Sequence, residues 1–331
     1  MKILKKLNHF FMGSSFLLTL TFLAVSSVRV QSSAEPSEIK PVPSQSLVSE
    51  EKIDFKKVIT DIPETSLLGL KMSFTKESLP YWGAILGSTW ILYNNDEVIL
   101  RDWQKAGRDM GIGNDDNTHP VITMGDIDIL RLPTDKGSLL YFLGDGWTHG
   151  TIAMGFLLNG YANDNNRAYN TGLKLAHGMA VSTIFSQVLK RAFGRESPYV
   201  RTEYQGKWRP FPSLAAYQNK TPQYDAMPSG HIMTATLTFT IVNDSYPEYS
   251  SFVVPIGVTW VSLLGFQMVN NGVHWASDYP LGIAMGYVFA KASSQLGKKP
   301  VDASGKVQEQ SWMLLPASTP SGEGITWLYN Y

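Results

Sequence analysis

The sequence predicts an all-α fold, and three observations support this class. Apolar and small residues gather into six stretches of helical length, over residues 79–93, 139–158, 172–193, 232–242, 252–269 and 278–290. Within these stretches apolar residues recur with helical spacing more often than with alternating spacing. Clusters of β-branched residues are brief. We therefore expect a helical bundle, with strands confined to a short C-terminal β-hairpin.

The composition supports a folded core and narrows the chemistry. The chain has 331 residues, of which 44% are hydrophobic and 17% charged, with 28 Lys+Arg against 28 Asp+Glu and no cysteine. This apolar content is enough for a full core. A neutral chain without basic runs argues against a nucleic-acid partner. Without cysteine there is no thiolate metal site, disulfide or thiol nucleophile, so the available groups are histidines, carboxylates, hydroxyls or a bound metal.

Residues 1–34 have the pattern of a secretory signal peptide. Lys2, Lys5 and Lys6 precede an uncharged run from Phe10 to Val25, and small residues follow up to residue 34. We therefore expect export to a bacterial periplasm or cell envelope. An uncleaved anchor helix is the alternative, although the apolar run is shorter than the ~20 residues that span a bilayer comfortably.

The remainder divides into three parts. Residues 35–51 are rich in Pro, Ser and Glu and are predicted to be a linker. Residues 52–300 hold the six helical stretches and form the predicted helical domain. In the tail, 301–331, two strand-like segments at 311–316 and 324–331 flank a turn-rich connection, which predicts the hairpin.

Polar interruptions decide whether these helices are expected to cross a membrane. The stretch at 172–193 contains Lys174, His177 and Gln187, and a charge at the bilayer centre costs about 3 kcal/mol. Only the stretch at 252–269 is long enough, and it contains Pro255. We expect a soluble bundle, with a membrane-embedded bundle as the alternative.

Three segments in the second half of the chain collect most of the catalytically useful groups. They are Lys-Arg-Ala-Phe-Gly-Arg-Glu-Ser-Pro over residues 190–198, Met-Pro-Ser-Gly-His over 227–231, and Gly-Val-His-Trp-Ala-Ser-Asp over 272–278. Each has an ordinary structural explanation. Basic residues suit a helix C-terminus, Pro and Ser suit a helix N-terminus, and a histidine–aspartate pair can be a structural hydrogen bond.

The functional interpretation of the last two segments is more specific. A helix that begins at Ser229–His231 aims free backbone N–H groups, a hydroxyl and an imidazole at one point, which suits an anion. His274 and Asp278 are four residues apart, so in a helix they would share a face and the carboxylate would fix one imidazole tautomer. An oriented neutral imidazole is a nucleophile.

Together, Lys190, the Pro-Ser-Gly-His segment and the His-Trp-Ala-Ser-Asp segment have the order and approximate spacing of a known signature. The pattern resembles that of the type 2 phosphatidic acid phosphatase family, which shares its helical core with bacterial class A acid phosphatases and vanadium haloperoxidases. The resemblance spans roughly Gly144 to Gly286. It implies a helical bundle of the acid phosphatase/haloperoxidase type.

The resemblance also implies an activity. It is the hydrolysis of a phosphomonoester or a lipid phosphate through a phosphohistidine intermediate, without a cofactor or metal. In that scheme His274 attacks phosphorus, Asp278 orients it, and His231 protonates the leaving alkoxide and then activates water. The non-bridging oxygens would be held by Lys190, the Ser229 hydroxyl and the Gly230 N–H.

Two arginines of the family pattern are absent, because Ser197 and Met268 occupy their positions. Arginine forks make bidentate, permanently charged contacts with phosphate that neither residue can replace. A nearby arginine, Arg191, Arg195 or Arg201, could substitute, and Arg195 is the strongest candidate. Alternatively, the substrate needs less charge compensation, or the chain is a weak or non-catalytic envelope protein that binds anionic ligands. A haloperoxidase would need the same arginines to hold vanadate.

Three further features have mainly structural explanations. Asp145 is expected to cap a helix, and His177 to be a core histidine with satisfied hydrogen bonds. The aromatic-rich segment 199–224 is a long loop, either a lid or lipid-facing rim, or aromatic packing over the bundle.

Overall fold

A computed structural model describes residues 51–125, 127–298, 311–319 and 322–330. The predicted signal peptide and all but the last residue of the predicted linker lie outside these ranges. The described part divides into a helical unit that ends at Ser294 and a second unit that begins at Gln295.

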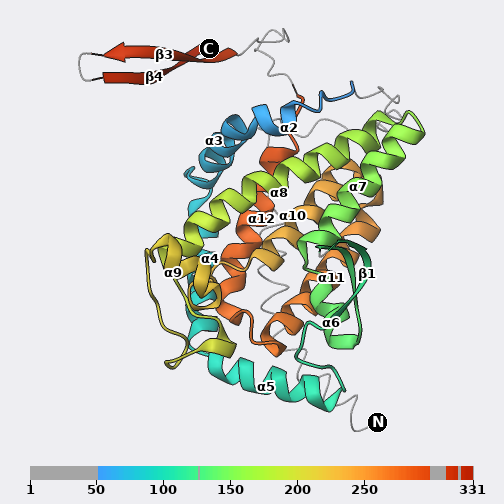
Figure 1. Ribbon diagram of the computed structural model, residues 1–331, viewed down its shortest axis with the longest axis vertical. Coiled ribbons are helices and arrows are strands. Elements are labelled where there is room, and N and C mark those ends of the chain that lie inside the picture. The colour runs from blue at the N-terminus through green and yellow to red at the C-terminus, as the bar shows by residue number, and fades with distance from the viewer. Residues whose placement is uncertain (1–50, 126, 299–310, 320–321, 331) are drawn as a thin grey trace, which may run out of the picture. The chain divides into compact units, whose positions relative to one another are not determined.

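Helices dominate the described residues, as the sequence predicts, and Figure 1 follows them in chain order. The α-helices and strands are α2 (Lys57–Thr60), α3 (Ile62–Ser73), α4 (Leu79–Tyr93), α5 (Asp96–Asp109), β1 (Thr118–Met124), β2 (Ile127–Pro133), α6 (Lys136–Phe142), α7 (Gly146–Ala162), α8 (Asn166–Phe193), α9 (Leu214–Asn219), α10 (Gly230–Ser245), α11 (Ser250–Asn270), α12 (Tyr279–Ser293), β3 (Ser311–Thr319) and β4 (Gly322–Asn330). Short 3₁₀ turns include η2 (Thr221–Gln223) and η4 (Ala276–Asp278).

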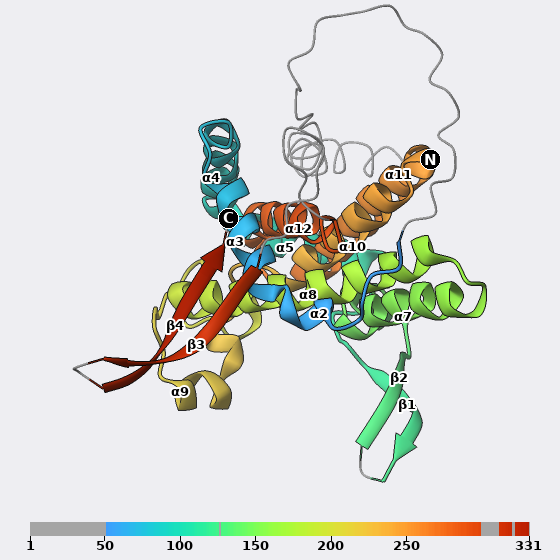
Figure 2. The same cartoon turned by 90° about the horizontal axis from the view of Figure 1, so that it is seen from above.

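Four helices form the centre of the bundle. Helix α8 packs against α7, α10 and α12, and α10 lies along α12 (Figure 2). Glycines allow the close approaches: a Cβ at Gly172 of α8 would lie 2.7 Å from the Ala153 carbonyl of α7. A Cβ at Gly286 of α12 would likewise collide with the Met233 carbonyl of α10. These small residues bring the helix backbones together.

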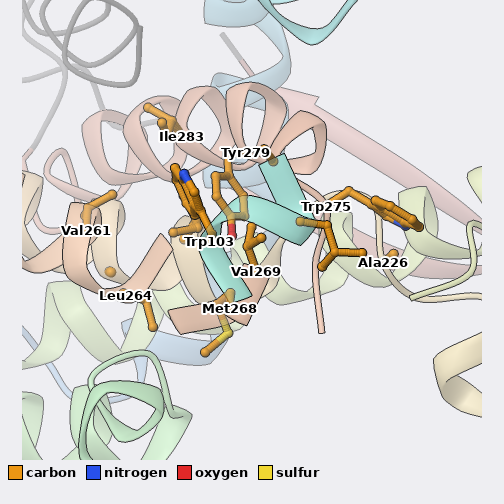
Figure 3. Packing of buried hydrophobic residues seen from close by; sticks show 13 residues of the cluster. Trp103, Ala226, Val261, Leu264, Met268, Val269, Trp275, Tyr279 and Ile283 are labelled. Atoms are coloured by element: carbon orange, nitrogen blue, oxygen red, sulfur yellow. The ribbon is translucent and has the colours of Figure 1, made fainter. Parts of the chain in front are cut away.

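Two clusters of buried apolar side chains form the core of the helical unit. One, shown in Figure 3, joins α5, α10, α11, η4 and α12, and includes Trp103, Ile232, Leu264, Met268, Trp275 and Tyr279. The other lies among α7, α8, α10 and α12, and includes Leu175, Met233, Leu237, Ile241 and Phe289. The first cluster connects α5, well before the sequence motifs, to the segment that carries the third motif.

Sequence signals set the limits of the two helices that carry motif residues. Asn165 caps α8, whose last residue, Phe193, precedes Gly194 in the left-handed conformation (φ 57°). A side chain there would meet the Arg209 carbonyl, so glycine is required both for the backbone and for the space. Ser229 caps α10 through a 3.4 Å hydrogen bond from the Ile232 N–H.

The structure differs from the sequence prediction in several elements. The stretch 139–158 is not one helix but parts of α6 and α7, interrupted at residues 143–145. The Asp145 side chain accepts a hydrogen bond from the Trp147 N–H at 3.0 Å, which confirms its role as a cap and starts the second helix. Helices α2, α3, α5 and α9 and the antiparallel pair β1–β2 were not predicted, although Asp96 and Glu97 in the first turn of α5 favour a helix start.

The second unit contains the predicted hairpin. Strands β3 and β4 pair antiparallel, from Ser311 opposite Asn330 to Thr319 opposite Gly322. The prediction of a C-terminal hairpin is confirmed.

Among the described residues, one helix is long and apolar enough to cross a membrane, judged by length and composition alone. It runs over Pro247–Asn270 and includes α11.

Candidate active site

Two imidazoles from separate motifs meet in the helical unit. His231 is the second residue of α10, and His274 lies in the loop between α11 and η4. The His231 Nδ1 and the His274 Nε2 are 3.2 Å apart. The two rings meet nearly edge to face, with centroids 5.4 Å apart.

Backbone contacts fix the tautomer of His274. Its Nδ1 lies 2.7 Å from the carbonyl oxygen of Ala226, and a carbonyl can only accept. The Nδ1 therefore carries the proton, and the Nε2 has the free lone pair. In the resting site this lone pair accepts the N–H of His231 Nδ1. His274 thus presents a nucleophilic nitrogen to the other imidazole.

Asp278 does not orient His274 in the way the sequence suggested. The segment is a loop followed by a 3₁₀ turn rather than one helix, because Pro280 lies in the first turn of α12, which begins at Tyr279. The Asp278 Oδ2 accepts a hydrogen bond from the Trp275 N–H at 2.8 Å and lies 3.7 Å from the His274 Nδ1. Asp278 therefore acts on His274 through charge, while Ala226 fixes the tautomer.

Arg195 holds Asp278 in place. Its Nη1 donates to the Asp278 Oδ1 at 2.6 Å, and its Nη2 donates to the Asp96 Oδ2 at 2.8 Å. All three side chains are fully buried. The guanidinium carbon lies 5.1 Å from each of three ring centroids, those of Tyr93, Trp208 and Trp275.

This arrangement corrects the role expected of Arg195. Both terminal nitrogens bind carboxylates, so its charge is balanced within the protein rather than available to a phosphate. The other two arginines considered also have partners: Arg191 donates to Gln187 and covers the ring of Tyr217. Arg201 donates to the Pro198 carbonyl at 3.0 Å and lies 3.4 Å from Glu97.

The residues that replace the family arginines are both buried. Met268 is fully buried in the first core cluster (Figure 3). Ser197 is 2% exposed, and its N–H donates to the Pro222 carbonyl. Neither position supplies a charge to the imidazole pair.

Lys190 provides a cation beside the start of α10. Its Nζ donates to the carbonyl of Asp225 at 2.5 Å and lies 3.5 Å from the Asp225 Oδ2. A Cβ on Gly230 would lie 3.9 Å from the Lys190 Cε, which places the lysine stem next to the first turn of α10. The first N–H groups of a helix have no intrahelical partners, so this turn adds donors to the cation.

This geometry coincides with a family match. Residues 171–301 match the family model of the PAP2 superfamily. This match indicates phosphatase-type hydrolysis in general. No curated protein and no solved structure matches the chain significantly.

Burial controls the charge of the imidazoles in this site. Burial, reinforced by the charge of Lys190, lowers the pKa of His274 to about 3. Burial also lowers the pKa of His231 well below 6.5, with His274 and Lys190 acting in the same direction. Both rings are therefore neutral in the empty site at about pH 7. Burial raises the pKa of Asp278 to about 6, so this carboxylate is mainly ionised at that pH.

Two other histidines are buried in the helical unit. His177 is a satisfied core histidine, as predicted, with Nδ1 2.8 Å from the Val58 carbonyl and Nε2 2.8 Å from the Thr65 hydroxyl. His149 pairs its Nδ1 with the Thr238 hydroxyl at 2.9 Å, and burial lowers its pKa to about 4.

Sequence reasoning missed four residues around the site. Asp96 and Tyr141 lie before the PAP2 match, and Asp225 and Ala226 lie just before the second motif. The ring of Tyr141 meets that of His231 edge to face at 5.3 Å. Only Asp225 and Ala226 had a sequence signal, because they directly precede a recognised motif. Within the described residues, no cluster of three or more His, Asp or Glu side chains is arranged to hold a metal ion.

Proposed function

We propose that this protein is an exported phosphatase that hydrolyses a phosphomonoester or a lipid phosphate through a phosphohistidine on His274. The observation that carries the proposal is the pair of neutral imidazoles. The Ala226 carbonyl gives His274 a fixed tautomer, and its unprotonated Nε2 lies 3.2 Å from the His231 Nδ1. An oriented, neutral nitrogen beside a second imidazole suits covalent catalysis.

The proposed reaction has two displacements. The His274 Nε2 attacks phosphorus, the bond from phosphorus to the leaving oxygen breaks, and His231 protonates the leaving alkoxide. Water then attacks the phosphohistidine, His231 takes its proton, and the N–P bond breaks. Because His231 is neutral in the empty site, the bound anion must raise its pKa and load it with a proton first.

The remaining site residues have supporting roles in the proposal. Lys190, the Ser229 hydroxyl and the Gly230 N–H bind the non-bridging oxygens as negative charge builds. Asp278 stabilises the positive charge that develops on His274. Arg195 is a positioning residue, since it holds Asp278 rather than the substrate.

The proposed location rests on residues 1–34, whose basic, apolar and small-residue segments suit export to a bacterial periplasm or cell envelope. Contact with a membrane surface suits a lipid phosphate substrate. Integration into the membrane is the alternative, for which the apolar helix over Pro247–Asn270 is the candidate span.

A second function is favoured by one observation, the uncompensated loss of two arginines. With Ser197 and Met268 buried, the chain would be a weak or inactive PAP2 module that binds anionic ligands. Two lost charge-assisted contacts of about 1.5–3 kcal/mol each would slow phosphoryl transfer by about a hundred- to ten-thousand-fold.

The test is hydrolysis of p-nitrophenyl phosphate by the full chain. We expect measurable turnover, and in His274→Ala a loss of about a thousandfold or more because the variant lacks the nitrogen that attacks phosphorus. His119→Ala is the control: His119 is an exposed histidine on β1 and should leave the rate unchanged. Turnover unchanged in His274→Ala would contradict the mechanism. Phosphate binding without turnover would support the binding module.

A further inference from the structure

Asp225 lies in the segment that positions both the cation and the nucleophile. It sits between η2 and α10, where its own carbonyl accepts from Lys190 and the next carbonyl, that of Ala226, accepts from His274. The Asp225 carboxylate lies 3.5 Å from the Lys190 Nζ, and its side chain is 28% exposed. A negative charge is therefore fixed beside the cation expected to bind phosphate.

The positive charges near the imidazole pair are already balanced. Arg195 is paired with two buried carboxylates, those of Asp96 and Asp278. Lys190 is the other cation that the described residues bring to the site, and Asp225 offsets it. Unlike a site with the two family arginines, this one has no surplus of positive charge for a second negative charge on a ligand.

We propose that Asp225 is a specificity-determining residue that makes the site favour phosphoryl groups with one negative charge over those with two. This inference rests on the proposed function. The favoured substrate would be a phosphodiester, or a phosphomonoester that keeps one proton, rather than a doubly charged phosphomonoester. The absence of the two family arginines has the same effect on selectivity, because the site lacks two positive charges that would stabilise a bound dianion.

Coulomb's law supports this selectivity. The repulsion between the Asp225 carboxylate and a phosphoryl group is proportional to the charge on that group, so a dianion experiences twice the repulsion of a monoanion. The partial exposure of Asp225 weakens the interaction through solvent screening but does not change this ratio. The field of the carboxylate extends over the neighbouring side chains: burial, followed by the charges of Asp225 and Asp116, raises the pKa of Tyr199.

With a phosphodiester the same two displacements balance. The His274 Nε2–P bond forms as one ester P–O bond breaks, and the departing alkoxide takes a proton from His231. Water then attacks phosphorus, its proton passes to His231, and the N–P bond breaks. The products are an alcohol and a phosphomonoester.

The test compares two substrates in three Asp225 forms of the full chain at about pH 8, where a phosphomonoester is a dianion because its second pKa is about 6. The substrates are p-nitrophenyl phosphate and bis(p-nitrophenyl) phosphate. We expect Asp225→Asn to raise kcat/KM about tenfold for the monoester and about threefold for the diester. The repulsion energy that the substitution removes is twice as large for a dianion as for a monoanion, so the logarithm of the rate change is also twice as large. Asp225→Glu should keep the wild-type ratio.

The Lys190 contact with the backbone carbonyl of residue 225 survives either substitution, so the geometry of the cation is retained. The matched control is Asp244→Asn, which removes the carboxylate partner of Lys291 near the opposite end of α10. This variant should leave kcat/KM unchanged for both substrates. An equal change for both substrates in Asp225→Asn, or the same shift in Asp225→Glu, would overturn the proposal.

Calorimetric binding of inorganic phosphate separates this inference from the proposed function. If the wild type turns over neither ester, the proposed function fails. Asp225 is then tested by binding alone, where phosphate at about pH 8 should bind about tenfold more tightly to Asp225→Asn than to the wild type. Equal affinity would reject the role of Asp225.

Discussion

Two consecutive backbone carbonyls position the reactive groups of the site. The Asp225 carbonyl holds Lys190, and the Ala226 carbonyl holds His274. A backbone carbonyl cannot exchange protons, so it fixes the neutral tautomer of His274 more strictly than a carboxylate would. The Asp278 carboxylate can therefore accept hydrogen bonds from Arg195 and the Trp275 N–H instead of from His274.

Asp96 is the residue outside the motifs on which this arrangement most depends. It binds the Arg195 Nη2 and accepts from both the N–H and the hydroxyl of Ser277. We expect Asp96→Ala to lower the free energy of unfolding by about 3 kcal/mol, because it leaves a buried guanidinium with one carboxylate and a buried turn with unpaired donors. Urea denaturation measures this change.

Asp102→Ala on the same helix is the control for Asp96→Ala. Asp102 pairs with Arg101 at 2.9 Å, but both side chains are exposed. Its loss should lower the free energy of unfolding by less than about 1 kcal/mol. Equal, small effects of the two substitutions would show that the buried cluster contributes no more than a surface ion pair.

At the scale of elements, the contact between α10 and α12 sets the distance between the two halves of the site. His231 lies in the first turn of α10, and Asp278 immediately precedes α12. Along the crossing, the backbone of α10 lies against Gly286 of α12, where an added Cβ would meet the Met233 carbonyl and lie 2.9 Å from the Thr236 Cβ. Neither neighbouring group is a flexible side-chain end that can move away cheaply.

We therefore expect Gly286→Ala to lower the free energy of unfolding by about 2 kcal/mol, since overpacking outweighs the gain of about 1 kcal/mol in helix propensity. Thermal or urea unfolding measures the change. Gly83→Ala in α4 is the matched control, because nothing lies within 4 Å of its added Cβ. That variant should be more stable by about 0.5–1 kcal/mol. If both substitutions stabilised the protein, α10 and α12 would have to move apart without strain, which would contradict the prediction for Gly286→Ala.

At the scale of the whole molecule, the parts that the sequence predicted are those with local signals. Helical spacing predicted α4 with the residue limits 79–93, and cap residues marked the starts of α7 and α10. The motifs predicted that His231 and His274 would meet. The β1–β2 pair escaped prediction because its strands are short, with seven residues each, and Pro120 interrupts the first of them.

The rest of the site depends on contacts between residues far apart in the chain. Asp96 bonds to Ser277, which is 181 residues away, and no motif around Asp96 indicates this. The expectation that Arg195 binds a phosphate failed for the same reason. Asp96, which is distant in the sequence, provides the second carboxylate that balances its charge. The start of α12 at Tyr279 likewise placed His274 outside a helix, against the helical spacing assumed for it.

The central claim is that His274 becomes phosphorylated, and trapping that intermediate tests it most directly. In full-length His231→Ala, p-nitrophenyl phosphate should still form the phosphohistidine, because its leaving group needs little protonation, but hydrolysis should slow without a base for water. Mass spectrometry after a rapid quench should then find one phosphoryl group, labile to acid, on the peptide that contains His274. None should form in the His231→Ala, His274→Ala double variant. Turnover without any adduct on His274, or an adduct that survives in the double variant, would contradict the account.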